Sequence, residues 1–136
     1  MNSLEEAYRN TNYTVNIESK IITINIGRDN PEWTQFLKLK NQTFYFYITA
    51  WNPFSEITSP EKNEEANKKL KERLISLGLL VYDGVGYSAD MKWHEDSFSA
   101  LGGNRDLAYQ LGKEFRQNAI VIGNIGEVPE LLYTNK

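Results

Sequence analysis

The sequence predicts an α/β fold of the α+β kind, in which residues 1–136 form a single domain. Its core is a mixed β-sheet of about five to six strands with helices packed on its faces. β-rich segments alternate along the chain with segments of helical periodicity, as in proteins that pack helices against a sheet. Two neighbouring β-rich segments are separated by a short polar turn, which predicts a hairpin and argues against a purely parallel sheet.

The N-terminal part of the chain is expected to hold a short helix, a hairpin and a second helix. Residues 3–8 are expected to be helical, and residues 13–17 and 21–26 have the composition of paired strands. Asn30 precedes Pro31, which is typical of a helix start because asparagine caps the helix and proline is favoured in its first turn.

The middle of the chain combines a buried strand with the longest helix. Residues 44–50 are apolar or aromatic at almost every position, so we expect a central strand that is buried on both faces. The helix begins at Ser59, and its buried stripe contains two amides, Asn63 and Asn67. Both need partners because an unpaired buried amide costs on the order of 1–3 kcal/mol. The loop at residues 51–59 is the nearest place to find them.

The C-terminal half continues the alternation of strands and helices. Residues 79–83 and 92–101 are expected to be strands, and the glycine-rich segment 84–90 between them is expected to be a flexible turn. Asn104 caps a further helix. The chain then continues with a buried strand at residues 118–122 and a segment at residues 129–133 that packs on the edge of the sheet.

Composition and charge exclude several classes of protein. The chain contains no cysteine, so disulfide bonds, thiolate catalysis and cysteine-ligated zinc are excluded. There is no apolar run near the ~20 residues that cross a bilayer and no signal peptide, so we expect a cytoplasmic protein without membrane contact. The chain is acidic, with a net charge of −3, and shows no basic patch, which argues against nucleic-acid binding.

Polar and aromatic residues gather where the central strand ends. Thr49, Trp51, Asn52 and Ser55 follow one another closely at this point. Because open α/β sheets usually place ligands at strand ends, we interpret this segment as part of a ligand-binding site. The alternative is structural, with Asn52 starting a turn and Trp51 covering the core.

A second candidate segment runs from Trp93 to Ser97. If it is extended, Trp93, Glu95 and Ser97 share one face. A tryptophan beside a carboxylate can stack on a ligand, and burial would raise the pKa of Glu95 toward that of a general acid or base. Glu95 is therefore the candidate catalytic residue. The alternative is an edge strand with Trp93 in the core and Glu95 paired to a lysine.

Other motifs predict no cofactor or metal site. His94 is the sole histidine, and one histidine among scattered carboxylates is a weak ligand set for a transition metal. Gly84 and Gly86 lack the third glycine of a dinucleotide-binding loop. Metal ligands are therefore predicted to be absent, and the identity of any cofactor stays unknown.

Two adjacent amides, Gln117 and Asn118, open the last buried strand. Asn118 could equally end the preceding helix. The two amides share a site with Asn52 only if this strand runs antiparallel to the central strand. With parallel strands they would lie at the opposite edge of the sheet.

Four segments of the chain form a recognisable combination. They are Thr49-Ala-Trp-Asn-Pro53 with Ser55, the pair Asn63 and Asn67, Trp93-x-Glu95-x-Ser97, and Gln117-Asn-Ala-Ile120. Together they resemble the bacterial family labelled Domain of Unknown Function family 3293. The opening helix with Tyr13 and the pair Ile26-Gly27 fit as well, whereas Asp96 stands where the family tends to have proline. The resemblance implies a small standalone domain from bacteria or phage, and it supplies no reaction.

Two functional hypotheses follow, and the residues leave open whether the protein is an enzyme. In the first, the chain binds a polar small ligand, which could be nucleotide-like, and Glu95 would act as acid or base if catalysis occurs. The residues predicted to form this pocket are Thr49, Trp51, Asn52, Ser55, Asn63, Asn67, Trp93, Ser97, Gln117 and Asn118. In the second, the chain is a protein–protein interaction module without catalysis, such as an inhibitor or regulator carried by a phage or mobile element. Its six Phe and eight Tyr residues would supply the contact surface.

Overall fold

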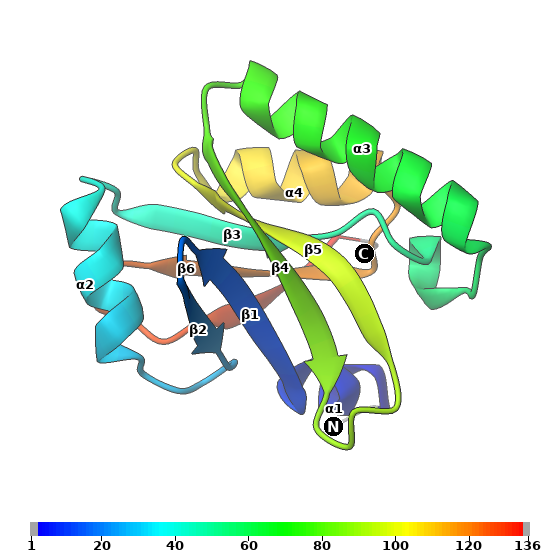
Figure 1. Cartoon of the computed structure of the whole chain (residues 1–136), viewed down its shortest axis with the longest axis horizontal. Coiled ribbons are helices and arrows are strands. Elements are labelled where there is room, and N and C mark those ends of the chain that lie inside the picture. The colour runs from blue at the N-terminus through cyan, green and yellow to red at the C-terminus, as the bar shows by residue number, and fades with distance from the viewer. Residues whose placement is uncertain (1–2, 135–136) are drawn as a thin grey trace.

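The computed structural model describes residues 3–134 and consists of a seven-stranded β-sheet with four α-helices around it (Figure 1). The strands lie in the order β2-β1-β4-β5-β3-β6-β7. The elements are α1 (Ser3–Arg9), β1 (Thr11–Ile17), β2 (Lys20–Ile24), α2 (Pro31–Leu39), β3 (Phe44–Ile48), the short 3₁₀ helix η1 (Pro53–Ser55), α3 (Pro60–Ser76), β4 (Leu80–Ser88), β5 (His94–Leu101), α4 (Arg105–Glu114), β6 (Ala119–Asn124) and β7 (Glu130–Tyr133). The predicted α/β class, with helices packed on a sheet, is confirmed.

The sheet differs from the prediction in strand number and in strand direction. The segment expected to pack on the edge is itself a strand, β7, which contributes to a total of seven. Every pair is antiparallel, although a mixed sheet was expected. The reason is the strand order, because β5 lies between β3 and β4, and β3 lies between β5 and β6. The strands joined by α3 or by α4 therefore run in the same direction without pairing to each other.

Strand β3 is central, and its side chains alternate between two hydrophobic clusters. Tyr45 and Tyr47 pack in a cluster with residues of α2 and of the hairpin β1–β2. Phe46 and Ile48 pack in a second cluster with residues of α3 and α4, which lie together on one face of the sheet in Figure 1. The prediction of a strand that is buried on both faces is confirmed.

Three predicted helix starts are confirmed by their capping side chains. Asn30, Ser59 and Asn104 each accept a hydrogen bond from the backbone N–H three residues later, at 3.0, 3.3 and 2.9 Å. Each bond satisfies a backbone donor that the first helical turn leaves without an internal partner. These starts were predictable because a cap depends on residues that are close in sequence.

Strand β4 contains residues 84–88 of the segment that was expected to be a flexible turn, so the prediction is wrong for these residues, and the turn is confined to the end of the segment. Gly84 and Gly86 both lie within the strand. A Cβ atom on Gly84 would lie 1.8 Å from the backbone oxygen of Thr14, so the absence of a side chain lets β1 approach β4 closely. The hydroxyl of Thr14 donates to the backbone oxygen of Val85 at 2.8 Å and accepts from its N–H at 3.0 Å. Gly84 therefore permits the close approach, and the bonds of Thr14 hold β1 beside the C-terminal half of β4.

Candidate functional site

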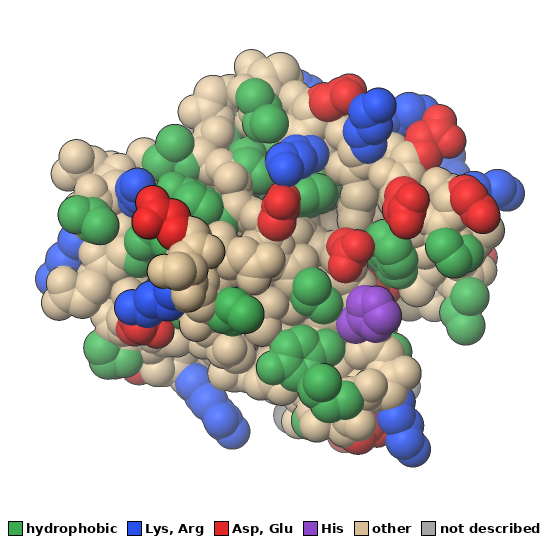
Figure 2. Space-filling view, in the orientation of Figure 1, with side chains coloured by type: hydrophobic (Ala, Val, Ile, Leu, Met, Phe, Trp, Pro, Cys, Tyr) green, Lys and Arg blue, Asp and Glu red, His purple; other side chains and the backbone are tan. Residues whose placement is uncertain are grey.

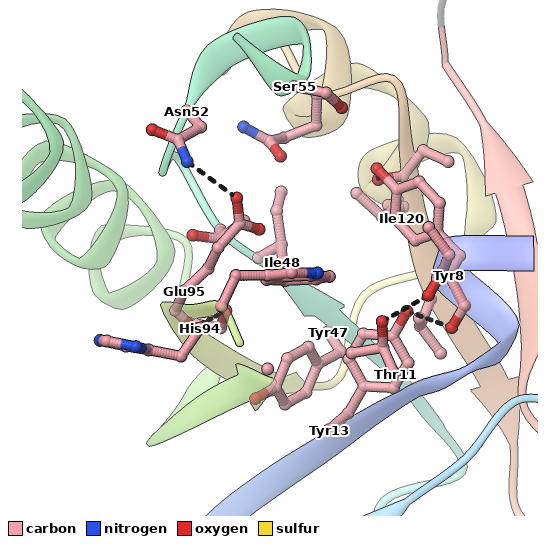
Figure 3. Close-up of a pocket in the computed structure, with 18 of the residues that line it drawn as sticks. Tyr8, Thr11, Tyr13, Tyr47, Ile48, Asn52, Ser55, His94, Glu95 and Ile120 are labelled. Carbon is pink, nitrogen blue, oxygen red and sulfur yellow. Dashed lines mark hydrogen bonds between the residues drawn. The ribbon is translucent and has the colours of Figure 1, made fainter. Parts of the chain in front are cut away.

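A pocket of about 380 Å³ lies beside α1, at the end of β3 and the start of β5 (Figure 3). Its walls come from α1, β1, β3, β5, β6 and the loop that follows β3. Apolar side chains such as Ile48 and Ile120 form part of the wall. In Figure 3, Glu95 points toward Asn52 on one side of the pocket, and a group of tyrosines lies on the other side.

The loop after β3 carries three residues in the left-handed region of backbone conformation. Asn52, Phe54 and Ser55 have φ angles of 46°, 54° and 63°. Such residues cost on the order of 1–3 kcal/mol each and persist only when surrounding contacts hold them. Here the N–H of Phe54 donates to the backbone oxygen of Arg116 at 2.6 Å. The loop is thus held in a defined shape where Asn52 and Ser55 line the pocket.

The amides of Asn63 and Asn67 are buried behind the pocket and hold the loop in place. Asn63 accepts from the N–H of Asn52 at 2.9 Å and donates to the side-chain oxygen of Asn52 at 3.0 Å. Asn67 accepts from the N–H of Ala50 at 2.8 Å and donates to the backbone oxygen of Asp96 at 2.7 Å. The loop at residues 51–59 supplies the partners of Asn63, as expected, whereas the partners of Asn67 lie outside that loop. Neither side chain lines the pocket, so both act on its shape indirectly.

Glu95 is half-buried and faces the pocket. Its Oε2 accepts a hydrogen bond from Nδ2 of Asn52 at 3.4 Å, so its described partner is an amide and not a lysine. Burial raises the pKa of Glu95 from 4.5 to about 7, and the hydrogen bond from Asn52 opposes this shift. Both the protonated and the ionised carboxyl are therefore populated near neutral pH, which is the condition for a general acid or base.

Three tyrosines that the sequence did not identify as site residues form the other side of the pocket. Tyr8 of α1, Tyr13 of β1 and Tyr47 of β3 all line it. Burial raises the pKa of Tyr8 to about 12, with a smaller contribution from the negative charge of Glu95. Burial also raises the pKa of Tyr13 and of Tyr47. These hydroxyls therefore stay protonated at neutral pH. The sequence placed Tyr47 in a strand buried on both faces and Tyr13 in a strand of the predicted hairpin, and it gave neither a role in the site.

Gln117 and Asn118 lie near the loop because β3 and β6 are antiparallel. Gln117 donates to the backbone oxygen of Trp51 at 3.4 Å and lines the pocket. Asn118 donates to the hydroxyl oxygen of Ser55 at 3.0 Å but does not line the pocket itself. The structure therefore has the antiparallel arrangement, which is the alternative in which these amides can share a site with Asn52.

Seven of the predicted site residues line the pocket, and four surround it. Those that line it are Thr49, Asn52, Ser55, Trp93, Glu95, Ser97 and Gln117. Those that lie around it are Trp51, Asn63, Asn67 and Asn118. Trp93, Glu95 and Ser97 share the pocket face, as expected from an extended segment, whereas Trp51 is half-buried outside the lining.

The charge of the pocket is carried by few side chains. Among the described residues that line it, Glu95 is the carboxylate, His94 is the histidine, and there is no lysine or arginine. Within residues 3–134, no three His, Asp or Glu side chains gather in a way that could hold a metal ion. Over the same residues, no helix is long and apolar enough to cross a membrane.

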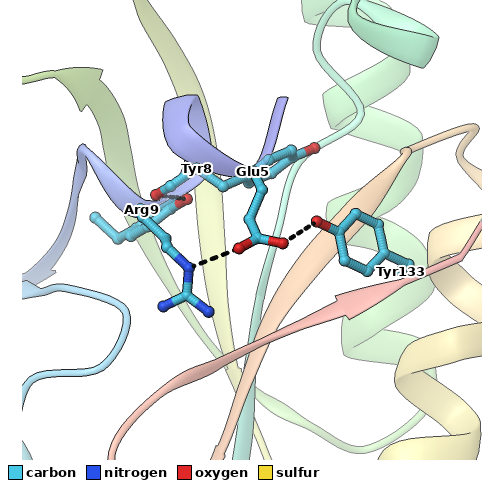
Figure 4. A network of polar contacts seen from close by, with 5 residues as sticks. Glu5, Tyr8, Arg9 and Tyr133 are labelled. Carbon is cyan, nitrogen blue, oxygen red and sulfur yellow. Dashed lines mark hydrogen bonds and ion pairs between the residues drawn. The ribbon is translucent and has the colours of Figure 1, made fainter. Parts of the chain in front are cut away.

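A second polar cluster joins α1 to β7 outside the pocket lining (Figure 4). Glu5 accepts from Nε of Arg9 at 3.2 Å and from the hydroxyl of Tyr133 at 3.1 Å. The hydrogen bond from Arg9, followed by that from Tyr133, lowers the pKa of Glu5. This cluster connects α1 to β7 at the protein surface.

Comparison with known proteins gives a family and no function. The family model described as "Protein of unknown function (DUF3293)" matches residues 48–120, more than half of the chain. This range includes every residue predicted to form the site, and it excludes Tyr8, Tyr13 and Tyr47. No curated protein and no solved structure matches the chain. The resemblance that the motifs indicated is confirmed, and the chain belongs to the DUF3293 family.

Proposed function

We propose that this protein binds a small organic molecule in the pocket beside α1, with Glu95 as the principal polar contact. The observation that supports the proposal is a carboxyl group that is half-buried in a pocket and receives one long hydrogen bond from Asn52. Buried charged groups are normally paired or fully hydrogen-bonded, so a carboxyl of this kind has capacity for a ligand.

The size and composition of the pocket agree with such a ligand. Small-molecule sites occupy roughly 300–1,000 Å³ and combine apolar walls with a few polar groups that orient the ligand. A volume of about 380 Å³ places this pocket at the small end of that range. Ile48, Ile120 and the tyrosines would contact an apolar or aromatic body, whereas Asn52 and Glu95 would contact a polar group.

The sequence allowed a nucleotide-like ligand, and the charge of the lining residues limits which part of a nucleotide could bind in the pocket. A phosphate would meet the carboxylate of Glu95 without a lysine or arginine from the described lining residues. Like charges at short range are unfavourable in a partly buried site. The part of a nucleotide that fits is therefore the uncharged base, and the phosphates would have to remain outside.

A pocket-filling variant tests the proposal. Ala7 is exposed on α1 and lines the pocket, so Ala7→Trp should fill the pocket without disturbing the core. Glu6→Trp places the same side chain at an exposed position of α1 that does not line it, and serves as the matched control. Both variants and the wild type would be screened by thermal shift against a library of nucleobases, amines, sugars and small aromatic acids.

A true pocket ligand at 100 times its Kd stabilises the wild type by about 2.7 kcal/mol, which raises Tm by roughly 10 °C. We expect this shift to persist in Glu6→Trp and to disappear in Ala7→Trp. Ligands that shift Ala7→Trp as strongly as the wild type would place binding elsewhere. A library that shifts none of the three proteins would contradict the proposal.

A protein partner is the second candidate, because large apolar side chains are exposed around the pocket. Ile57 is 93% exposed, Phe54 48% and Trp93 43%. Figure 2 shows hydrophobic side chains around the single histidine on this face. Ile57→Ser should abolish binding of a protein partner and only weaken binding of a small ligand. Ala7→Trp should abolish binding of a small ligand and only weaken binding of a protein partner.

A further inference from the structure

Of the seven hydroxyl groups that line the pocket, that of Ser55 accepts from Nδ2 of Asn118 at 3.0 Å. The other six are oriented by the protein main chain. Each donates its proton to a backbone carbonyl oxygen, at distances between 2.6 and 3.3 Å. The six groups belong to Tyr8, Thr11, Tyr13, Tyr47, Thr49 and Ser97. A hydroxyl has one proton and two lone pairs, so a group that has given its proton away can only accept a hydrogen bond from a ligand.

The amide donors of the lining are also engaged within the protein. Nδ2 of Asn52 donates to Glu95 at 3.4 Å, and Nε2 of Gln117 donates to the backbone oxygens of Trp51 and Phe115 at 3.4 and 3.2 Å. Glu95 itself is a pure acceptor when ionised. The lining keeps few other donors, on Ser55, Trp93 and His94, so acceptors are in excess and a complementary ligand supplies donors.

The charge of the lining favours the same kind of ligand as this excess of acceptors. Glu95 contributes a negative charge, and none of the described residues that line the pocket is a lysine or arginine. Aromatic side chains, among them Trp93, Tyr8 and Tyr47, form part of the wall, and such rings also accommodate organic cations. A cation with N–H groups supplies both the hydrogen-bond donors and the positive charge that the lining favours, whereas a carboxylate or a phosphate supplies neither.

We propose that the ligand of this pocket is an organic cation, a protonated amine on an aromatic or aliphatic body, whose N–H groups donate to the carboxylate of Glu95. This inference rests on the proposed function and specifies the chemical class of its ligand. Asn52 then positions Glu95, and the tyrosine side of the pocket contacts the body of the amine.

The proposal requires that amine binding depends on pH through Glu95. The groups that face Glu95, or neighbour it along β5, are Tyr8 of α1, Tyr13 of β1, Tyr47 of β3, and His94 and Asp96 of β5. The pKa values of all three tyrosines are raised, so the tyrosines stay neutral at pH 6–8. β4 presents Gly86 opposite Glu95, which has no side chain. The pKa of about 7 for Glu95 then makes the ionised fraction, and the amine affinity, rise about tenfold from pH 6 to pH 8.

Matched probes of different charge test this inference. One set is 2-phenylethylamine, 2-phenylethanol and phenylacetate, and the second is tryptamine, indole-3-ethanol and indole-3-acetate. Each set varies the charge while it keeps the ring. Binding to the full chain would be measured by NMR titration at pH 6 and pH 8, on the wild type, Glu95→Gln and the control Asp96→Asn, which removes an exposed carboxylate outside the lining. His94→Gln tests whether the histidine contributes to the pH dependence.

We expect the amines to bind at least tenfold more tightly than the alcohols and acids at pH 8, and to lose this preference in Glu95→Gln but not in Asp96→Asn. The tenfold gain from pH 6 to pH 8 should persist in His94→Gln. Alcohols or acids that bind as tightly as the amines would overturn the inference and leave the proposed function intact. An absence of binding by all six probes in the wild type would count against both.

Discussion

Glu5 of α1 and Glu95 of β5 have opposite electrostatic surroundings. Glu5 lies at the surface with Arg9 and Tyr133 as donors, and its pKa is lowered (Figure 4). Glu95 lies in the pocket with Asn52 as its donor, and burial raises its pKa to about 7 (Figure 3). Glu5 has its cation within the chain, whereas the pocket around Glu95 contains no described lysine or arginine.

The difference shows how a structural carboxylate can be told from a candidate functional one. A carboxylate with a guanidinium partner has its charge neutralised by the fold, and it connects two elements. A carboxyl that is desolvated without a cation is less stable when ionised, and binding a cationic donor would relieve that cost. Both residues are glutamates, so the distinction arises from their surroundings and not from residue type.

The largest expected effect comes from disrupting the contact that holds β1 beside β4. Gly84→Ala places a Cβ atom 1.8 Å from the backbone oxygen of Thr14, so the strands must separate. We expect a loss of about 3 kcal/mol or more in the free energy of unfolding. The pKa of Glu95 should fall at the same time, because β1 carries Tyr13 into the pocket. Urea denaturation and NMR titration measure the two effects.

Gly86→Ala is the control for that variant. Its nearest new contact, to Cδ1 of Tyr13, is an ordinary 3.6 Å, and we expect a cost below about 1 kcal/mol. Equal losses for the two variants would mean that the approach of β1 to β4 is not what Gly84 permits.

The next effect concerns the pH dependence of stability. The pKa of Glu95 is raised, so between pH 4.5 and about 7 the native state holds a proton that the unfolded state has lost. Its contribution is fully present below pH 4.5 and is lost as pH rises through 7, by at most about 3 kcal/mol and less with solvent screening. Glu95→Gln should remove this decline, so the variant should gain on the wild type as pH rises. A stability difference that is independent of pH would refute a raised pKa.

A smaller loss is expected when Glu95 loses its donor. Asn52→Gly keeps the left-handed backbone and removes the side chain that accepts from the N–H of Thr58 and from Asn63. We expect a destabilisation of about 2 kcal/mol, and a further rise in the pKa of Glu95, since the bond from Asn52 lowers it. Asn41→Gly, at an exposed position with a φ of 58°, should be nearly neutral. Equal unfolding midpoints for the two variants would show that the Asn52 bonds contribute little.

The smallest effect concerns Glu5. Arg9→Gln removes the first cause of its low pKa, so the pKa of Glu5 should rise toward its ordinary value while that of Glu95 stays unchanged. Because Glu5 stabilises the fold when ionised, its contribution is lost as pH falls, opposite in sign to Glu95. Carboxyl ¹³C titration by NMR distinguishes the two, with Arg28→Gln as an exposed control. A pKa of Glu5 that does not move would assign the shift to Tyr133 instead.

Local order was largely predictable from the sequence. Asn30, Ser59 and Asn104 cap their helices, because capping involves residues three positions apart. The shared face of Trp93, Glu95 and Ser97 follows from the alternation of an extended chain. Patterns of this kind depend on neighbours along the chain, and so they can be found without knowledge of the fold.

Gly84 shows where local reasoning was misleading. Glycines inside a strand usually indicate a turn or a bulge, and the sequence does not say which backbone will approach them. The approach of Thr14, seventy residues earlier in the chain, decides the matter. Strand direction could not be found from local sequence either, because β3 and β6 are antiparallel as a result of the strand order in the sheet.

The sequence by itself determined most of the elements, the family and most of the predicted polar residues at the pocket. Tertiary structure decided that Tyr8, Tyr13 and Tyr47 complete it, for instance through the bond of Tyr8 to the backbone oxygen of Ala119, which lies 111 residues away. It also decided that Glu95 is desolvated and lacks a cation among the described lining residues, whereas Glu5 has one. The physical reason is that desolvation and charge pairing depend on which surfaces meet in space, and residue spacing along the chain does not contain that information.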